Sequence, residues 1–288
     1  MLSYQHAFHA GNHADILKHF VLTFVLNSLN KKDKPYTFFD THSGSGLYDL
    51  YDNRILKTGE AEKGIQKLLS KTSDFPEEMQ IYINLVKEYS KKNLYPGSPE
   101  IERRLVRAGN CLILSELHPQ EIENLRNNMN HPTVAPETKA KLQIHNRNGW
   151  EMIKALTPPP TKRGAVLIDP SYEETQDYID AAKYITEVNK KWSNGIIMLW
   201  YPLLAHRESD ITVMLETILE NARKVNPNVE TCNLQLCVYS KDEKDLPRLY
   251  GSGMLVINSP WMLKESGEKI INFTRNVIAP QFQQGMQV

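Results

Sequence analysis

The feature that most constrains this chain is a regular alternation of short apolar runs with segments of helical periodicity. The apolar runs lie at 36–40, 111–117, 141–145, 165–169, 195–201, 231–240 and 252–259. Helical segments separate most of them, and an N-terminal helix that Asn12 can cap precedes the first run. Alternation of this kind predicts an α/β fold, a mostly parallel seven-stranded sheet with helices on both faces. No helical segment separates the last two runs, so we expect these two strands to pair antiparallel.

The interval between the first two apolar runs is too long for a single strand–helix–strand step. The first run ends at Asp40 and the second at Glu116, whereas one strand–helix–strand step needs roughly 20 residues between such positions. The stretch 48–95 is polar and helical, and it stops before Gly97-Ser98-Pro99, where Ser98 can cap the next helix, which we expect to run to Gly109. We therefore expect an inserted small helical subdomain at 48–95, with the main domain formed by 1–47 and 96–288.

Composition excludes several classes of protein. The chain has 288 residues, 41% of them hydrophobic, with 34 Lys+Arg against 34 Asp+Glu, which argues against disorder of the whole chain. The longest apolar run, 20–26, is far shorter than the roughly 20 residues of a membrane span. The first residues do not form a secretory signal, so we expect a cytoplasmic protein with no membrane association. Because the net charge is zero, a nucleic-acid partner must contact a local basic patch.

Polar and glycine residues follow the first three predicted strands, where doubly wound sheets bind their ligands. A loop with Gly44 and Gly46 follows Asp40, Glu116 ends the second strand, and Asn148-Gly149 follows the third. Such a glycine loop lets the backbone approach a ligand, and an acidic residue on the next strand can accept both hydroxyls of a ribose. The pattern favours a nucleoside-containing cofactor. The GxGxxG and GxxxxGK[ST] spacings are absent, which argues against a dinucleotide and a P-loop nucleotide.

The most specific motif is Asp169-Pro170-Ser171-Tyr172, directly after a buried strand. An exocyclic amine is a poor nucleophile because its lone pair is delocalised into the ring. A carboxylate and a backbone carbonyl that both accept from the NH2 group favour tetrahedral geometry at the nitrogen, and an aromatic ring can stack on an extruded base. Asp169, the Pro170 carbonyl and Tyr172 can supply these three functions, although the same residues also fit an ordinary turn.

Asp40, Gly44-Ser45-Gly46 and the Asp169 motif together resemble the S-adenosylmethionine-dependent adenine N6-methyltransferases. More narrowly, the chain resembles the RlmJ family of 23S ribosomal RNA adenine N6-methyltransferases. The segments that carry this resemblance are LSYQHAFHAGNHADILKH (2–19), THSGSG (41–46), YPGSP (95–99), SELHP (115–119), NGW (148–150), LIDPSYE (167–173), LWYP (199–202) and SGMLVINSPW (252–261). The resemblance implies a Rossmann-like methyltransferase domain with an N-terminal motif segment at 1–30 and an inserted helical subdomain.

The resemblance also implies roles for individual residues. Its cofactor, S-adenosyl-L-methionine, would contact His19, His42, Ser98, Glu116, Asn148 and Gly149. Asp169, Pro170 and Tyr172 would form the catalytic motif, and Tyr4 would contact the RNA. We expect Lys18 to face the RNA as well, because the first helix should flank the mouth of the site. Two departures are Ser171, where the family's motif has a second proline, and Asn148, where the family has aspartate.

Other interpretations stay open on the sequence alone. Related tetrapeptides also serve in DNA adenine and protein glutamine methyltransferases, and Ser171 leaves room for a catalytically inactive protein that binds cofactor and RNA. His6, His9, His13 and His19 crowd the N-terminus, but the helix start between them and the absence of HExxH lead us to expect no metal. We expect a monomer whose partner is 23S ribosomal RNA.

Overall fold

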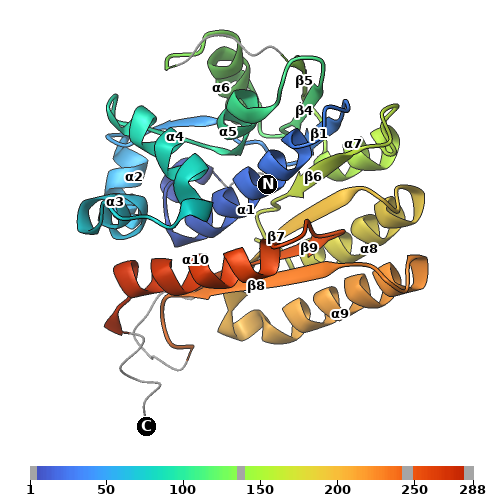
Figure 1. Ribbon diagram of the computed structural model, residues 1–288. Helices are drawn as coiled ribbons and strands as arrows, with labels where there is room; N and C mark the ends of the chain where they lie inside the picture. Colours follow the sequence, from blue (N-terminus) through green and yellow to red (C-terminus); the bar gives the residue numbers. More distant parts are fainter. Residues whose placement is uncertain (1–4, 135–139, 242–248, 282–288) are drawn as a thin grey trace.

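A seven-stranded sheet forms the centre of the protein, for which the computed structural model describes residues 5–134, 140–241 and 249–281 (Figure 1). Its strand order is β5-β4-β1-β6-β7-β9-β8. The strands are β1 (Thr37–Asp40), β4 (Cys111–Ser115), β5 (Lys141–His145), β6 (Gly164–Ile168), β7 (Ile196–Leu204), β8 (Thr231–Cys237) and β9 (Leu249–Ile257). The first five in this spatial order are parallel, and β9 runs antiparallel to both β7 and β8. The seven-stranded Rossmann-like sheet and its antiparallel final pair are confirmed.

The centre of the sheet is formed by its most apolar strands. Every residue of β1 and β6 is buried, as expected for parallel strands that are covered on both faces. In the register, Asp40 lies opposite Leu114 of β4 and Leu167 of β6. The residues that follow these three strands therefore emerge side by side at one edge of the sheet.

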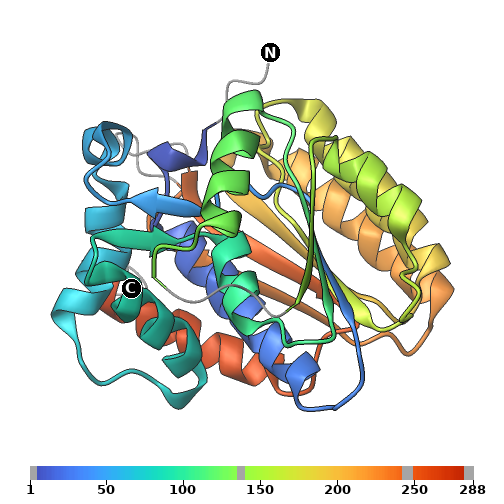
Figure 2. The same cartoon turned by 90° about the horizontal axis from the view of Figure 1, so that it is seen from above.

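Helices cover both faces of the sheet and bury two separate hydrophobic clusters (Figures 1 and 2). One face carries α1 (His13–Asn30), α5 (Ser98–Leu105), α6 (Pro119–Asn130) and α10 (Leu263–Ile278). The other carries α7 (Gly149–Leu156), α8 (Thr175–Lys191) and α9 (Glu208–Val225). The sequence interpretation did not include α10, although its buried Leu263, Ile270 and Ile271 recur at helical spacing.

The stretch between β1 and α5 contains short elements closed by a two-stranded ribbon. In order they are β2 (Leu47–Asp49), α2 (Asn53–Thr58), the π-helical turn η2 (Glu62–Gln66), α3 (Lys67–Lys71), η3 (Glu77–Met79), α4 (Gln80–Ser90) and β3 (Leu94–Pro96). The ribbon pairs β2 antiparallel with β3 and was not predicted. Buried Ile65, Leu68 and Tyr82 belong to the same hydrophobic cluster as α1. The division into a main domain and a subdomain at 48–95 stays a prediction.

Two local expectations around α5 are wrong. Gly97, not Ser98, is the N-cap of α5, because the Ser98 hydroxyl instead donates to Asp40 Oδ2 at 2.7 Å. The helix ends at Leu105, four residues before Gly109, where we expected its end, because Val106 takes an extended conformation. Two shorter turns, η1 (His6–Phe8) and η4 (Ala205–Arg207), complete the fold. Among the described residues, no helix is both long and apolar enough to cross a bilayer.

Candidate active site

A cavity of about 200 Å³ lies at the carboxyl ends of β1, β4, β5 and β6. The residues that the sequence assigns to the cofactor all line it: His19, His42, Ser98, Glu116, Asn148 and Gly149. Asp169 and Pro170 line it as well, so the structure brings the two halves of the predicted site together. We call this space the cofactor cavity.

Glu116 is fixed to the glycine loop. Its Oε2 accepts from the backbone N–H of Gly44 at 2.7 Å, and its Oε1 accepts from that of His118 at 2.7 Å. Gly44 has a φ of 57°, a conformation that glycine adopts without strain. Burial raises the pKa of the Glu116 carboxyl above its ordinary value, against the effect of these N–H donors. A carboxyl held in this way presents its remaining lone pairs to a ligand in the cavity.

Behind Ser98 lies a pair of buried carboxyls. Asp40 accepts from the Ser98 hydroxyl and, at 3.1 Å, from the backbone N–H of His42, and burial raises its pKa to about 6. Glu102 is fully buried, and burial and the neighbouring Asp40 raise its pKa well above the ordinary value. Because the Ser98 hydroxyl donates its hydrogen bond to Asp40, the Ser98 oxygen can act toward the cavity only as an acceptor.

Asn148 and Gly149 begin α7 at the cavity wall. The Asn148 side-chain oxygen caps the helix by accepting from the N–H groups of Trp150 and Glu151 at 2.8 and 3.3 Å. Its amide NH2 is thus the group left for a ligand, and an aspartate at this position could form the same cap but could not donate. A side chain on Gly149 would press into the Thr41 carbonyl oxygen, so only glycine fits there.

The two predicted histidines of this cavity are neutral. Burial lowers the pKa of His42 to about 4, and its ring packs edge-on against Trp150 with centroids 5.4 Å apart. Burial also lowers the pKa of His19 to about 3, and its Nδ1 lies 2.8 Å from the Tyr95 hydroxyl. His19 Nε2 is buried without a hydrogen-bond partner in the described part of the chain, which leaves it to a ligand.

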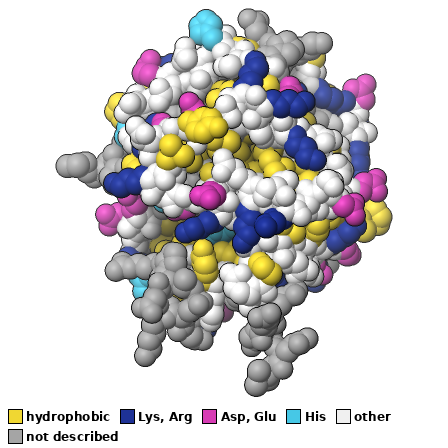
Figure 3. All heavy atoms as spheres, turned by 90° about the vertical axis from the view of Figure 1, so that its left-hand side faces the viewer, with side chains coloured by type: hydrophobic (Ala, Val, Ile, Leu, Met, Phe, Trp, Pro, Cys, Tyr) yellow, Lys and Arg dark blue, Asp and Glu magenta, His cyan; other side chains and the backbone are white. Residues whose placement is uncertain are grey.

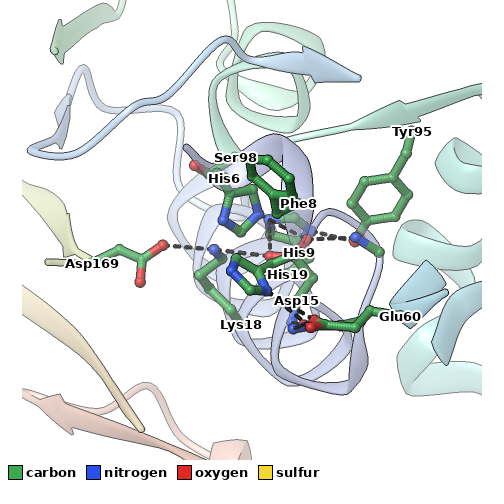
Figure 4. Close-up of polar contacts among 12 residues, drawn as sticks. His6, Phe8, His9, Asp15, Lys18, His19, Glu60, Tyr95, Ser98 and Asp169 are labelled. Atoms are coloured by element: carbon green, nitrogen blue, oxygen red, sulfur yellow. Dashed lines mark hydrogen bonds and ion pairs between the residues drawn. The ribbon is translucent and has the colours of Figure 1, made fainter. Parts of the chain in front are cut away.

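A buried ionic network links α1 to the Asp169 motif (Figure 4). Lys18 Nζ lies 2.6 Å from Asp169 Oδ2 and 2.9 Å from Asp15 Oδ1. Asp15 Oδ2 in turn accepts from the Gly11 N–H at 2.8 Å and lies 3.0 Å from His6 Nε2. Burial works against both charges, yet His6 and the Lys18 ammonium hold the pKa of Asp15 well below the ordinary value, and the two carboxylates raise that of Lys18. Asp15 and Lys18 therefore form a buried ion pair.

A second cavity, of about 170 Å³, meets the cofactor cavity at Asp169. Tyr172, Trp200 and Pro202 line its far wall, and Lys18 and Asp15 line the side toward α1. We call this space the base cavity.

The Tyr172 side chain is held in place by a hydrogen bond to the backbone of β7. Tyr172 has a φ of 53°, a costly conformation for an aromatic residue, and its hydroxyl donates to the Trp200 carbonyl at 3.0 Å. Its ring centroid lies 6.0 Å from that of Trp200. Tyr172 is mostly buried, with its ring packed against Tyr178, and it contributes to the wall of the cavity beside Asp169.

Two predicted substrate contacts differ in outcome. Lys18 was expected to face RNA at the mouth of the site, but its side chain is only 5% exposed and is held by two carboxylates. The expectation of a surface position is wrong, because an ammonium on α1 can reach Asp169 from inside the fold. Tyr4 lies outside the described residues.

The sequence alone assigned no role to Asp15 and did not place His6 in the site. The signal for Asp15 was present, since Asp15 and Lys18 stand one helical turn apart on an otherwise apolar helix. His6 lines both cavities, which its sequence neighbourhood did not indicate. No group of three or more metal-ligating side chains occurs within 5–134, 140–241 and 249–281.

Comparison with known proteins places the chain among methyltransferases of ribosomal RNA. Residues 33–288 match the family model described as "Ribosomal RNA large subunit methyltransferase D, RlmJ". The chain is 36% identical to ribosomal RNA large subunit methyltransferase J of Escherichia coli K12, over 97% of this chain and 95% of that protein. It is 37% identical to the protein of the same name from Haemophilus influenzae, over 98% and 95% of the two chains. The chain belongs to the RlmJ family.

A solved structure supports the same relationship for the fold of this RlmJ-family chain. Protein LPL1258 of Legionella pneumophila superimposes with a TM-score of 0.80 at 30% identity, covering 94% of this chain and 95% of that one. The RlmJ-family chain is a methyltransferase, and the cavities at the carboxyl edge of its sheet are its candidate active site.

Proposed function

We propose that the protein transfers a methyl group from S-adenosyl-L-methionine to the N6 amino group of one adenine in 23S ribosomal RNA. The observation that carries this proposal is the state of Asp169, which lies where the two cavities meet. Lys18 binds its Oδ2, while Oδ1 has no hydrogen-bond partner in the described part of the chain. A carboxylate oxygen without a partner at this point is suited to accept from an amino group.

The residues of the cofactor cavity fit the proposed donor. Glu116 can accept from ribose hydroxyls, and the Asn148 amide can donate to a ring nitrogen of the adenine moiety. Ser98, an acceptor only, and the unpartnered His19 Nε2 suit the amino and carboxylate groups of the methionine moiety. S-adenosylmethionine supplies a methyl group on a positively charged sulfur. The side chains around it bind and orient it, and the reaction needs no covalent enzyme intermediate.

The Asp169 motif positions the acceptor amine. Asp169 Oδ1 accepts one N–H, and the Pro170 carbonyl, which likewise has no partner among the described residues, accepts the other. These two bonds draw the nitrogen lone pair out of conjugation and toward the methyl group. Tyr172 and Trp200 provide aromatic surface for an adenine that has left its helix. Ser171 relaxes the backbone constraint on Pro170, but the Tyr172–Trp200 bond holds the far end of the motif.

Lys18 acts on the substrate through Asp169 in this proposal. Its ammonium binds one carboxylate oxygen of Asp169 and fixes the orientation of the side chain, so that the other oxygen meets the base. The expected contact of Tyr4 with RNA remains part of the proposal, as does the monomeric state.

Nucleoside mass spectrometry tests the proposed activity. Purified protein is incubated with labelled S-adenosylmethionine and protein-free 23S ribosomal RNA that lacks the modification, with DNA and a glutamine peptide as competing acceptors. We expect stoichiometric N6-methyladenosine at one position of the RNA. Methyl transfer to DNA or glutamine in preference to RNA contradicts the substrate, and cofactor binding without any transfer contradicts the activity.

A further inference from the structure

A third cavity, of about 330 Å³, adjoins the base cavity and shares Asn12 and Leu249 with it. Its walls are the N-terminal end of α1, the turn η2 with the start of α3, and the C-terminal end of α10. Because Thr58 of α2 and Lys67 of α3 also line it, the space beside Asp169 continues toward these two helices. We call this third space the flanking cavity.

Two lysines make the flanking cavity cationic. Lys67 Nζ donates to the Ile278 carbonyl at 2.8 Å, and the ammonium of the exposed Lys63 has no hydrogen bond or ion pair with any described residue. Among the described residues that line the cavity, Glu60 is the sole carboxylate. More lysine and arginine side chains stand on the face with α2 and α3, next to hydrophobic ones (Figure 3).

The Glu60 charge is already compensated. His9 Nδ1 lies 3.0 and 3.1 Å from its two oxygens, and the Asn12 amide donates to Oε2 at 2.9 Å. Burial opposes ionisation of Glu60, but the bond and charge of His9 hold its pKa below the ordinary value. Glu60 raises the pKa of His9 in return, against the effect of burial. The net charge that a ligand meets in the flanking cavity therefore comes mainly from Lys63 and Lys67.

The other surfaces of the flanking cavity suit a flat, partly polar ligand. Half-buried Tyr239 and the apolar Val238 and Leu249 form one wall. On the α1 side, His13 Nε2 is buried and has no hydrogen-bond partner among the described residues. Burial lowers the pKa of His13 to about 4, so the ring is neutral and open to a hydrogen bond with a ligand. A phosphate beside lysines and a base against tyrosine is the combination that proteins use for single-stranded RNA.

We infer that the flanking cavity binds the nucleotide next to the target adenine in the same RNA strand. Its phosphate lies against Lys63 and its base against Tyr239. The shared wall at Asn12 and Leu249 places this nucleotide directly beside the adenine in the base cavity. The inference rests on the proposed function, since it assigns a second contact to the same RNA strand.

RNA binding as a function of salt tests the phosphate contact. The dissociation constant of a 23S RNA fragment that contains the methylated position is measured by fluorescence anisotropy for wild type, Lys63→Gln and Lys71→Gln. Lys71 is exposed on the same stretch but does not line the cavity, so it is a matched control. We expect Lys63→Gln to reduce the slope of log Kd against log salt by about one, and Lys71→Gln to leave it unchanged. Equal slopes for the two variants overturn the phosphate contact.

Tyr239 tests the base contact. We expect Tyr239→Leu to weaken binding by about fivefold or more and Tyr239→Phe to bind as wild type, because stacking needs the ring and not the hydroxyl. Unchanged S-adenosylmethionine affinity and melting temperature show that each variant is folded. Equal binding by Tyr239→Leu and wild type overturns the base contact.

These measurements separate the two proposals. If wild type methylates the RNA but neither Lys63→Gln nor Tyr239→Leu alters binding, the flanking contact is wrong and the proposed function stands. If wild type methylates no 23S adenine, the proposed function is wrong, and the inference that rests on it falls as well.

Discussion

The part of the site around the base cavity (the base side) and the part around the cofactor cavity (the cofactor side) each contain a buried aspartate. The pKa values of these two aspartates are shifted in opposite directions. Asp15 has the Lys18 ammonium 2.9 Å away, and its pKa lies well below the ordinary value. Asp40 accepts from a hydroxyl and an N–H, and burial raises its pKa to about 6. Burial alone therefore does not set the direction of the pKa shift. Neighbouring cationic groups lower the pKa of Asp15 against the effect of burial, whereas burial prevails at Asp40 and, together with the Asp40 charge, at Glu102.

The largest effect on the base side is expected from Asp169→Ala. The substitution removes the oxygen that accepts from the target amine, so turnover should fall by more than about 100-fold. Dissociation constants for S-adenosylmethionine should stay within about threefold of wild type, because the other cavity residues are intact. Single-turnover methylation and calorimetric titration measure the two quantities. Asp33→Ala, at a fully exposed position, is the control, and turnover near wild type for Asp169→Ala would contradict the assigned role.

The cofactor side could be predicted closely because it follows from a general rule of parallel sheets. Residues that end neighbouring strands meet at one edge, so Glu116, Asn148 and Asp169 could be assigned to one site from their places after apolar runs. The apolar runs themselves predicted the seven strands. They did not predict that Asp40 and Glu102 lie together, because Glu102 lies on α5 and reaches Asp40 only through the packing of that helix.

The base side could not be placed in the same way. Lys18 and Asp169 are separated by 151 positions, and their contact depends on how α1 crosses the sheet. Helical periodicity predicted α1 itself but treated a charged residue on it as solvated, the usual state of lysine. The ribbon β2–β3 was missed for a related reason, since such short strands acquire their structure from packing partners. The helix α10 is a different case, because its apolar residues do recur at helical spacing and the sequence interpretation left them out.

Substitution of the two buried aspartates tests the contrast directly. Asp15→Asn leaves Lys18 and His6 without their shared carboxylate and should cost about 3–5 kcal/mol of unfolding free energy. Asp40→Asn removes a carboxyl whose charge is disfavoured by burial, and the amide oxygen can still accept from the Ser98 hydroxyl, so it should cost less than about 1.5 kcal/mol. Urea unfolding at pH 7 gives both values. Equal losses of unfolding free energy in the two variants would mean that Asp15 and Asp40 do not differ in electrostatic environment.

A smaller effect, confined to the cofactor side, is expected from Glu116→Ala. The loss of a charged acceptor for ribose and for the Gly44 loop should raise the dissociation constant of S-adenosylmethionine by about 10- to 100-fold. With saturating cofactor, turnover should return to within about threefold of wild type, in contrast to Asp169→Ala. An unchanged dissociation constant would remove Glu116 from the cofactor site.

The smallest effect is a difference in pH dependence. Burial raises the folded-state pKa of Asp40 to about 6 and that of Glu102 well above its ordinary value, so the folded protein binds more protons than the unfolded chain above about pH 4. The pair therefore lowers stability as pH rises, through about pH 6 for Asp40 and further for Glu102. Glu102→Gln removes one of the two carboxyls and its repulsion on the other. The variant should therefore gain on the order of 1–2 kcal/mol relative to wild type between pH 4 and 7.

Urea unfolding across this range measures the gain, with Glu123→Gln on the exposed side of α6 as the control. A cost of burying the glutamine amide that does not depend on pH shifts the whole curve of unfolding free energy against pH for Glu102→Gln and leaves its slope unaffected. Parallel curves for this variant and wild type would show that Glu102 keeps its ordinary pKa. The cofactor side would then need a cation near Asp40 that balances both carboxyls, as Lys18 does for Asp15 and Asp169 on the base side.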